Sequence, residues 1–307
     1  MTKALHPRAF AVTVVWTLGL LYLGSVVHAT ESSLACPDWP TCFGTMTPVM
    51  TGGVFWEHLH RLVAGGLMLM FGLATWLAKN ETEDRPWIFR LCLAGLGLLV
   101  VQSIFGGLTV LFQLPDLVST THLGLALLFL VLATLLASST GWARNVDSWD
   151  ARRSSGVARF ATGAAALVFV QSILGGLVRH MDAGMACPDA PLCLGQVVPP
   201  LVNTPITIHF AHRVMGVITA LAIIGLASWM VRAGAPAALR TWGLLAGGLV
   251  VAQVSLGFLS VLTVLAVAPV SLHTLVAAAL LSSLVHIAIM ARLSARREPV
   301  EEPSMAA

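Results

Sequence analysis

The chain has 307 residues, of which 57% are hydrophobic and only 10% are charged, and its mean hydropathy is +0.86. Soluble domains carry about 25% charged residues, so this composition excludes a soluble protein and indicates an integral membrane protein. The net charge is only +3, and the basic residues are placed as a membrane topology would place them, so we expect no nucleic-acid partner.

Eight apolar stretches are each long enough to cross a hydrocarbon core, which takes about 20 helical residues. No alternating strand pattern is present, and helices satisfy their own backbone hydrogen bonds in lipid. We therefore predict an all-α integral membrane protein. The first stretch is too long for a signal peptide, so we expect it to be retained. The predicted spans are Phe10–Thr30, Phe55–Leu77, Trp87–Phe112, Val118–Ser138, Val157–Val178, Ile206–Val231, Ala238–Val267 and Ser271–Ala291.

Basic residues give the orientation of this topology. All but three of the 17 Lys and Arg residues fall on one side, and the positive-inside rule assigns that side to the cytoplasm. We expect a bacterial-type plasma membrane, cytoplasmic termini and cysteine loops on the outer face. The exceptions, near outer helix ends, are Arg61, Arg179 and Arg213. The cytoplasmic set is Lys3, Arg8, Lys79, Arg85, Arg90, Arg144, Arg152, Arg153, Arg159, Arg232, Arg240, Arg292, Arg296 and Arg297.

The chain contains an internal repeat. The segment Ala35–Gly44 matches Ala186–Gly195 at an offset of 151. Four helices in each half return to the same side, so we predict two parallel-repeat four-helix bundles, residues 1–145 and 150–307. A pseudo-twofold axis along the membrane normal would relate them. The same offset relates Gln102 to Gln253, Gly106 to Gly257 and His122 to His273.

Four histidines recur inside the predicted helices. His60 and His122 both lie about five residues into spans that run inward, so they share one depth, and His212 and His273 repeat that arrangement. A lone membrane histidine is more often a hydrogen-bonded structural residue, but the duplicated pairs favour ligation. Facing imidazoles can hold a haem iron from both sides. We predict one bis-histidine haem per half, since few acids or thiols are available for zinc.

Arg61 and Arg213 directly follow two of these ligands. Each could extend to the outer interface or pair with a haem propionate. The repeated His-Arg dipeptide favours the second role.

Two cysteine pairs lie in the predicted outer loops, an oxidising setting in which disulfides persist. We predict Cys36–Cys42 and Cys187–Cys193 disulfides, each worth only about 2 kcal/mol because the enclosed loop is short. Redox activity is the alternative, since a small exposed disulfide is easily attacked by a thiol; we favour the structural role for both. Cys92 has no partner and is expected to be buried.

The halves differ beside the first ligand. Glu57 precedes His60 by three residues and so shares its helix face, whereas His209 stands in that place before His212. A carboxylate beside one haem could accept a proton or stabilise a developing cation. The alternative is that Glu57 only compensates the helix dipole. We predict that Glu57 is catalytic. The sequence assigns no role to His28, His58, His180 and His209.

The chain resembles the haem A synthase family, which oxidises a methyl substituent of haem O to the formyl group of haem A. The resemblance covers essentially the whole chain. Any one of its motifs is weak, but the ordered set is specific. That set comprises a Cys-Pro-Asp-x-Pro-x-Cys loop in each half, Glu57-x-x-His60-Arg61, His212-Arg213, His122 and His273.

The resemblance implies that His60 and His122 bracket the substrate haem O, with Glu57 as the essential carboxylate. It implies that His212 and His273 hold haem b as an electron carrier. The oxygen would come from water and the electrons would leave, for example to a quinone. Haem O synthase is an expected partner, and a homo-oligomer is possible. Two other functions remain open: a dihaem b-type quinone-linked electron carrier and a quinone-linked thiol oxidase.

Overall fold

The computed structural model describes residues 5–81, 85–143 and 146–296. Within them, eight α-helices are long and apolar enough to cross a membrane, which confirms the predicted all-α fold. Lys3, Arg144 and Arg297, which contributed to the predicted orientation, lie outside the described residues. The helices are α1 His6–Ala29, α2 Gly52–Glu81, α3 Pro86–Leu111, α4 Asp116–Ala137, α5 Ala151–His180, α6 Thr204–Arg232, α7 Ala237–Leu262 and α8 Val267–Ser294.

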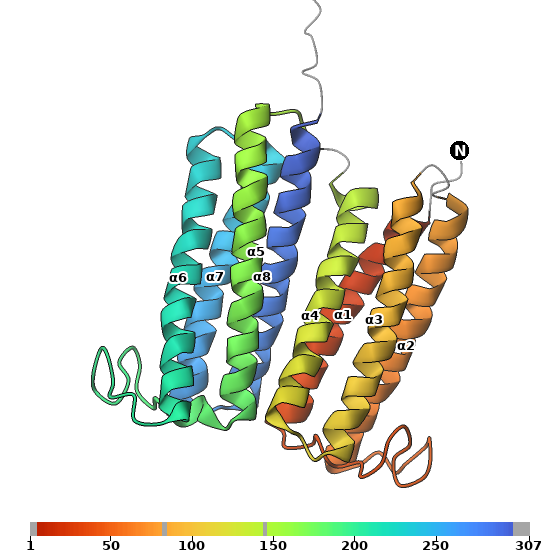
Figure 1. Ribbon diagram of the computed structural model, residues 1–307, viewed down its shortest axis with the longest axis vertical. Coiled ribbons are helices and arrows are strands. Elements are labelled where there is room, and N and C mark those ends of the chain that lie inside the picture. The colour runs from red at the N-terminus through yellow and green to blue at the C-terminus, as the bar shows by residue number, and fades with distance from the viewer. Residues whose placement is uncertain (1–4, 82–84, 144–145, 297–307) are drawn as a thin grey trace, which may run out of the picture.

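Helices α1 to α4 form one bundle and α5 to α8 form a second beside it (Figure 1). In each bundle, every helix packs against the next, and the fourth closes on the first. The seam consists of α1 on α8, α4 on α5, and α4 on α8. This pattern is unchanged when each helix is exchanged for its counterpart in the other bundle, as the predicted pseudo-twofold axis would require.

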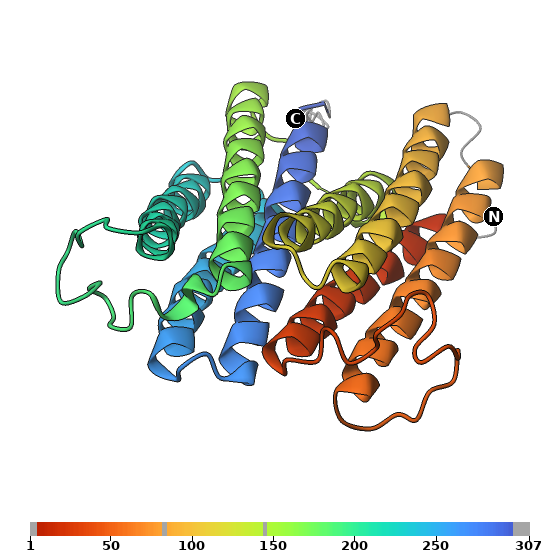
Figure 2. The ribbon, with the colours of Figure 1, turned by 60° about the horizontal axis from the view of Figure 1, so that its bottom comes forward.

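The long connections α1–α2 and α5–α6 lie at the same end of the two bundles, opposite the start of α1 and the end of α8 (Figures 1 and 2). Both predicted disulfides belong to these connections, so we call this the disulfide-loop end. The membrane face toward which it points stays a prediction.

The predicted end of the seventh span was wrong. Val267 was expected to close it, but α7 ends at Leu262 and Val267 begins α8. Between them, Val264 and Leu265 have φ angles of 53° and 61°, which an α-helix does not allow. The turn, residues 263–266, contains three apolar residues and one threonine, so hydropathy alone could not show it. Helix α5 begins at Ala151, six residues before the predicted Val157, and all remaining span ends lie within four residues of the prediction.

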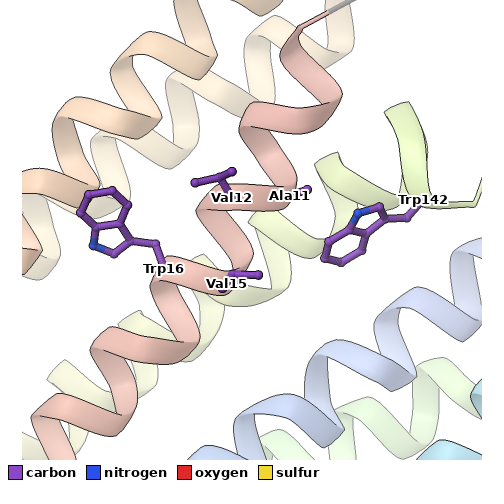
Figure 3. A pocket seen from close by; sticks show the side chains of 5 residues that line it. All are labelled: Ala11, Val12, Val15, Trp16 and Trp142. Atoms are coloured by element: carbon purple, nitrogen blue, oxygen red, sulfur yellow. The ribbon is translucent and has the colours of Figure 1, made fainter.

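Aromatic rings fill part of the first bundle. Phe71 of α2 lies between Phe10 and Phe129, with ring centroids 6.4 and 5.0 Å away. An apolar groove of about 370 Å³ lies on α1, and Figure 3 shows its lining. Its lining residues include none of the predicted haem ligands, so the candidate chemistry lies elsewhere. They are Ala11, Val12, Val15, Trp16 and Trp142.

Candidate active site

Each predicted haem ligand packs against a glycine of the preceding helix. A Cβ atom added to any of these glycines would lie about 3 Å from the imidazole Cε1, which is the shortest distance at which real Cβ atoms contact other atoms. The missing side chain therefore gives the ring room at its observed position. The pairs and their Cβ–Cε1 distances are Gly24 with His60 (3.0 Å), Gly106 with His122 (3.0 Å), Gly175 with His212 (2.9 Å) and Gly257 with His273 (3.1 Å).

The histidines of the fourth helices, His122 of α4 and His273 of α8, both carry their proton on Nδ1. His122 Nδ1 lies 3.1 Å from the Gln102 carbonyl oxygen, and His273 Nδ1 lies 3.0 Å from that of Gln253. A carbonyl oxygen only accepts, so Nδ1 carries the proton and Nε2 keeps its lone pair. This is the arrangement of a metal-ligating imidazole, whose second nitrogen donates to a backbone carbonyl.

In the second bundle, the His212 and His273 ring centroids are 6.5 Å apart. A metal about 2 Å from one nitrogen of each ring would place the centroids about 6 Å apart. In the first bundle, His60 Nδ1 is buried and has no hydrogen-bond partner among the described residues. The spacing, the tautomers of His122 and His273, and this unpaired nitrogen fit the predicted bis-histidine haem iron, whose ligation stays a prediction.

The Glu57 side chain is buried and both of its oxygens are occupied. Oε1 accepts a hydrogen bond from Arg61 at 2.5 Å, and Oε2 accepts one from the Cys36 amide at 2.8 Å. Glu57 lies beyond the first turn of α2, where charge no longer compensates the dipole well. Its contacts therefore favour a site role over the helix-dipole alternative.

Arg61 joins this carboxylate to the loop that follows α1. Its NH1 group donates to the carbonyl oxygens of Asp38 at 2.8 Å and Thr41 at 2.5 Å. Arg213 contacts the second loop in the same way. The pairing of either arginine with a haem propionate stays a prediction. The Arg213 acceptors are the carbonyl oxygens of Asp189 (2.8 Å), Leu192 (2.6 Å) and Cys187 (2.6 Å).

His209 takes the position of Glu57 in the second bundle. Its Nδ1 donates to the Ala183 carbonyl oxygen at 2.9 Å, so Nε2 is free to accept from Arg213 Nε at 3.1 Å. The two arginines therefore have similar loop contacts but different partners on their own helices, a carboxylate in one half and a neutral imidazole in the other.

Comparison with known proteins places the chain in a family. Residues 50–285 match the COX15-CtaA family model, described as cytochrome oxidase assembly protein. The chain belongs to this family. It is similar to the haem A synthases of Symbiobacterium thermophilum (30% identity, 75% of this chain and 76% of the relative) and Shewanella oneidensis (30%, 90% and 93%). The haem A synthase of Alkalihalophilus pseudofirmus is 29% identical over 91% of this chain and 96% of its own.

In this COX15-CtaA family member, both predicted cysteine pairs form disulfides, Cys36–Cys42 and Cys187–Cys193. All four cysteines are buried, which favours the structural role because an attacking thiol needs access to sulfur. Cys92 is free and buried, as expected.

Sequence reasoning assigned no role to the aspartate in each loop. Asp38 accepts from the Thr41 hydroxyl and from the amides of Phe43 (2.6 Å) and Gly44 (2.9 Å). The Thr41 and backbone hydrogen bonds hold the pKa of the Asp38 carboxyl below its ordinary 3.8. The amides of Gly195 and Leu194 likewise lower the pKa of Asp189. The repeated Asp in the loop motif was the signal for this role.

His28 and His180 meet at the seam between the bundles, with ring centroids 5.2 Å apart. His28 Nδ1 contacts the Ser33 hydroxyl at 3.2 Å, and His180 Nδ1 contacts the Thr120 hydroxyl at 2.9 Å. These bonds give the two histidines a place in the seam between α1, α4 and α5, outside the four-histidine set.

Proposed function

We propose that this protein is a haem A synthase that oxidises a methyl substituent of haem O to the formyl group of haem A. Its membership of the family and its similarity to haem A synthases over most of the chain support this activity. The observation that carries the proposal is the buried Glu57 carboxylate. It is one helical turn from His60, and its counterpart in the second bundle is neutral.

The first bundle, residues 1–145, would bind haem O between His60 and His122. The second, residues 150–307, would hold haem b between His212 and His273, where the bound cofactor supplies one-electron transfer. The glycine contacts support both assignments because they leave room for the four rings, and the Nδ1 hydrogen bonds support them because they fix the tautomers of His122 and His273. Arg61 and Arg213 would contact the propionates of these haems in addition to the loops.

Glu57 would act on the substituent being oxidised. A carboxylate in a site shielded from water can accept a proton or stabilise positive charge more strongly than one in solution. Water would then supply the oxygen of the product in each oxidation step. Arg61 and the Cys36 amide both favour the ionised form of Glu57, because each donates a hydrogen bond to it.

The released electrons must leave the protein, and we propose a quinone or another membrane acceptor. Haem O would come from a haem O synthase in the same membrane. The disulfide-loop end would face the outside of a bacterial-type plasma membrane, and both termini would be cytoplasmic. The basic residues that flank the opposite ends of the helices support this orientation.

Haem identification tests the activity directly. The full chain would be produced together with a haem O synthase, purified, and its haem extracted and identified by mass. We expect haem O, a hydroxylated form or haem A together with haem b. Haem b alone would contradict the proposal and support the dihaem electron carrier. The histidine variant His60→Ala is the control, since it should lose the haem O derivatives and keep haem b.

A further inference from the structure

A buried imidazole lies beside the first disulfide. One ring nitrogen of His58, on α2, and the sulfurs of Cys36 and Cys42 all lie within 4.8 Å of one another. The exposed fractions of these residues are 3% for His58 and 0% for both cysteines. Two sulfurs and one imidazole are the donor types that thiophilic metal ions prefer in proteins.

The hydrogen bonds of His58 leave one nitrogen available. Nε2 lies 3.0 Å from the Met46 carbonyl oxygen, so it carries the proton. Nδ1 is buried and accepts no hydrogen bond from any described residue. A buried polar atom without a partner is costly. A donating Nε2 and a free Nδ1 are also what a metal-ligating histidine shows.

We propose that Cys36, Cys42 and His58 form a binding site for a thiophilic cation of the Cu⁺ or Zn²⁺ class when the disulfide is reduced. Both sulfurs are buried, so reduction requires the loop to open locally before a thiol reductant can attack. The bond then opens in two exchange steps: the disulfide becomes two thiols, and two reductant thiols become one disulfide. Metal binding then releases both thiol protons and forms two metal–thiolate bonds and one metal–imidazole bond.

The required movement is small. Metal–sulfur bonds of about 2.3 Å and a metal–nitrogen bond of about 2.0 Å place tetrahedrally arranged donors about 3.5–3.8 Å apart. The donors now lie within 4.8 Å of one another. Once the bond is open, the sulfurs would move apart to that tetrahedral spacing, and the imidazole would approach them by roughly an ångström, through side-chain rotation.

Among the described residues, the second disulfide has no such third donor. His58 follows Glu57 directly, and the residue that follows His209 in the same place is Phe210. Cys187 and Cys193 therefore offer two sulfurs without the imidazole. This difference makes the second loop an internal control for the first.

The proposed metal site is joined to the candidate active site by one hydrogen bond. The Cys36 amide donates to Glu57 Oε2 at 2.8 Å, so opening the disulfide would act on a partner of the carboxylate. The metal proposal does not rest on the proposed haem chemistry, because its test measures only thiols and metal.

The test uses full-length protein in detergent, with Cys187→Ser/Cys193→Ser so that one pair remains. A phosphine reductant is applied without oxygen, and the released thiols are counted with a maleimide. Co²⁺ is then titrated, because its thiolate charge-transfer band appears only when sulfur binds the ion. Binding of Co²⁺ to the other histidines does not produce this band. We expect a saturable band, displaced by Zn²⁺, and at least about tenfold weaker binding in His58→Phe. The haem absorption spectrum reports whether each variant is folded.

A reciprocal variant sharpens the test. In Cys36→Ser/Cys42→Ser protein, Phe210→His should strengthen Co²⁺ binding by the second pair at least about tenfold. The proposal is overturned if the first pair releases no thiols while the haem spectrum is intact, or if no charge-transfer band appears. Equal Co²⁺ affinity of the folded His58→Phe variant would overturn it as well.

Discussion

The two bundles use the same arginine with different partners. Arg61 and Arg213 both donate to carbonyl oxygens of their disulfide loops. Along the helix, however, Arg61 pairs with the Glu57 carboxylate, whereas Arg213 donates to a neutral His209. The arginine–loop contact is therefore a shared structural feature. The carboxylate is what distinguishes the first bundle.

A buried carboxylate is costly unless it is paired, so Glu57 needs partners that the neutral His209 does not need. In the first bundle, Arg61 and the Cys36 amide compensate this cost. A residue that needs such support is a candidate for chemistry rather than for packing.

The largest effect is expected for Glu57→Gln. The amide keeps the shape but can neither accept a proton readily nor stabilise a cation, so conversion of haem O to haem A should fall about 10²- to 10⁴-fold. Haem binding should persist, because the four histidines are untouched. Product analysis by mass and the haem absorption spectrum measure the two effects separately.

The matched control is His209→Gln, which alters the same position in the second bundle. It should leave conversion within a few-fold of the parent. Normal haem A yield from Glu57→Gln would refute the catalytic role, and equal losses from both variants would show that the position matters only for structure.

Removal of one ligand from each bundle should separate the two haem sites. His273→Ala should lose most of the resident haem b, because the iron loses one axial nitrogen, and His122→Ala should instead lose haem O derivatives. Pyridine haemochrome analysis combined with mass identification gives the content of each. Loss of both haems from either single variant would contradict two separate sites.

The sequence predicted the fold well because the constraint is strong: lipid requires long apolar helices with few exceptions. The prediction of the helix end failed at Val264 and Leu265. The turn between α7 and α8 there is nearly as apolar as the helices around it. Hydropathy measures transfer to lipid and does not measure backbone conformation.

The histidines and Glu57 could be selected from the sequence because the repeat made them comparable, position by position. The contacts of Arg61 with Asp38 and Thr41 could not, because they join a helix to a loop about 20 residues away through backbone carbonyls. The repeated glycines Gly24 and Gly175 were visible at the offset of 151, but only the packing shows that they face His60 and His212.

Removal of either disulfide should lower the free energy of unfolding by about 2 kcal/mol, the value for a short closed loop. Cys187→Ser/Cys193→Ser should show this loss alone. Cys36→Ser/Cys42→Ser should also lower haem A formation, because the Cys36 amide would no longer be held at Glu57 Oε2. Thermal unfolding and haem A yield measure the two quantities. Equal haem A yields from the two variants would show that the first loop does not act on Glu57.

A methyl group added behind a ligand should have a smaller effect. Gly175→Ala would place Cβ 2.9 Å from His212 Cε1, and relief of this contact should cost about 1 kcal/mol and displace the ring. Gly163→Ala on the same helix meets nothing within 4 Å, so it serves as the control. The midpoint potential and affinity of haem b should change in the first variant and not in the second.

The smallest expected effect distinguishes the two loops by their response to acid. Hydrogen bonds lower the pKa of both Asp38 and Asp189 below 3.8. Each carboxylate therefore stabilises its loop above pH 3.8, and this contribution disappears as the pH falls through the lower folded-state pKa. Hydrogen exchange of the Gly44 and Gly195 amides, corrected for intrinsic rates, should report the loss.

Asp38 has one donor that Asp189 lacks, the Thr41 hydroxyl, whose position in the second loop is taken by Leu192. The first loop should therefore keep its protection to lower pH than the second. Thr41→Val should raise the pH at which Gly44 loses protection, while Asp38→Asn should remove the acid-dependent step from that amide. If the two loops lose protection at the same pH in the parent protein, the hydroxyl contributes nothing and the backbone amides alone hold each aspartate.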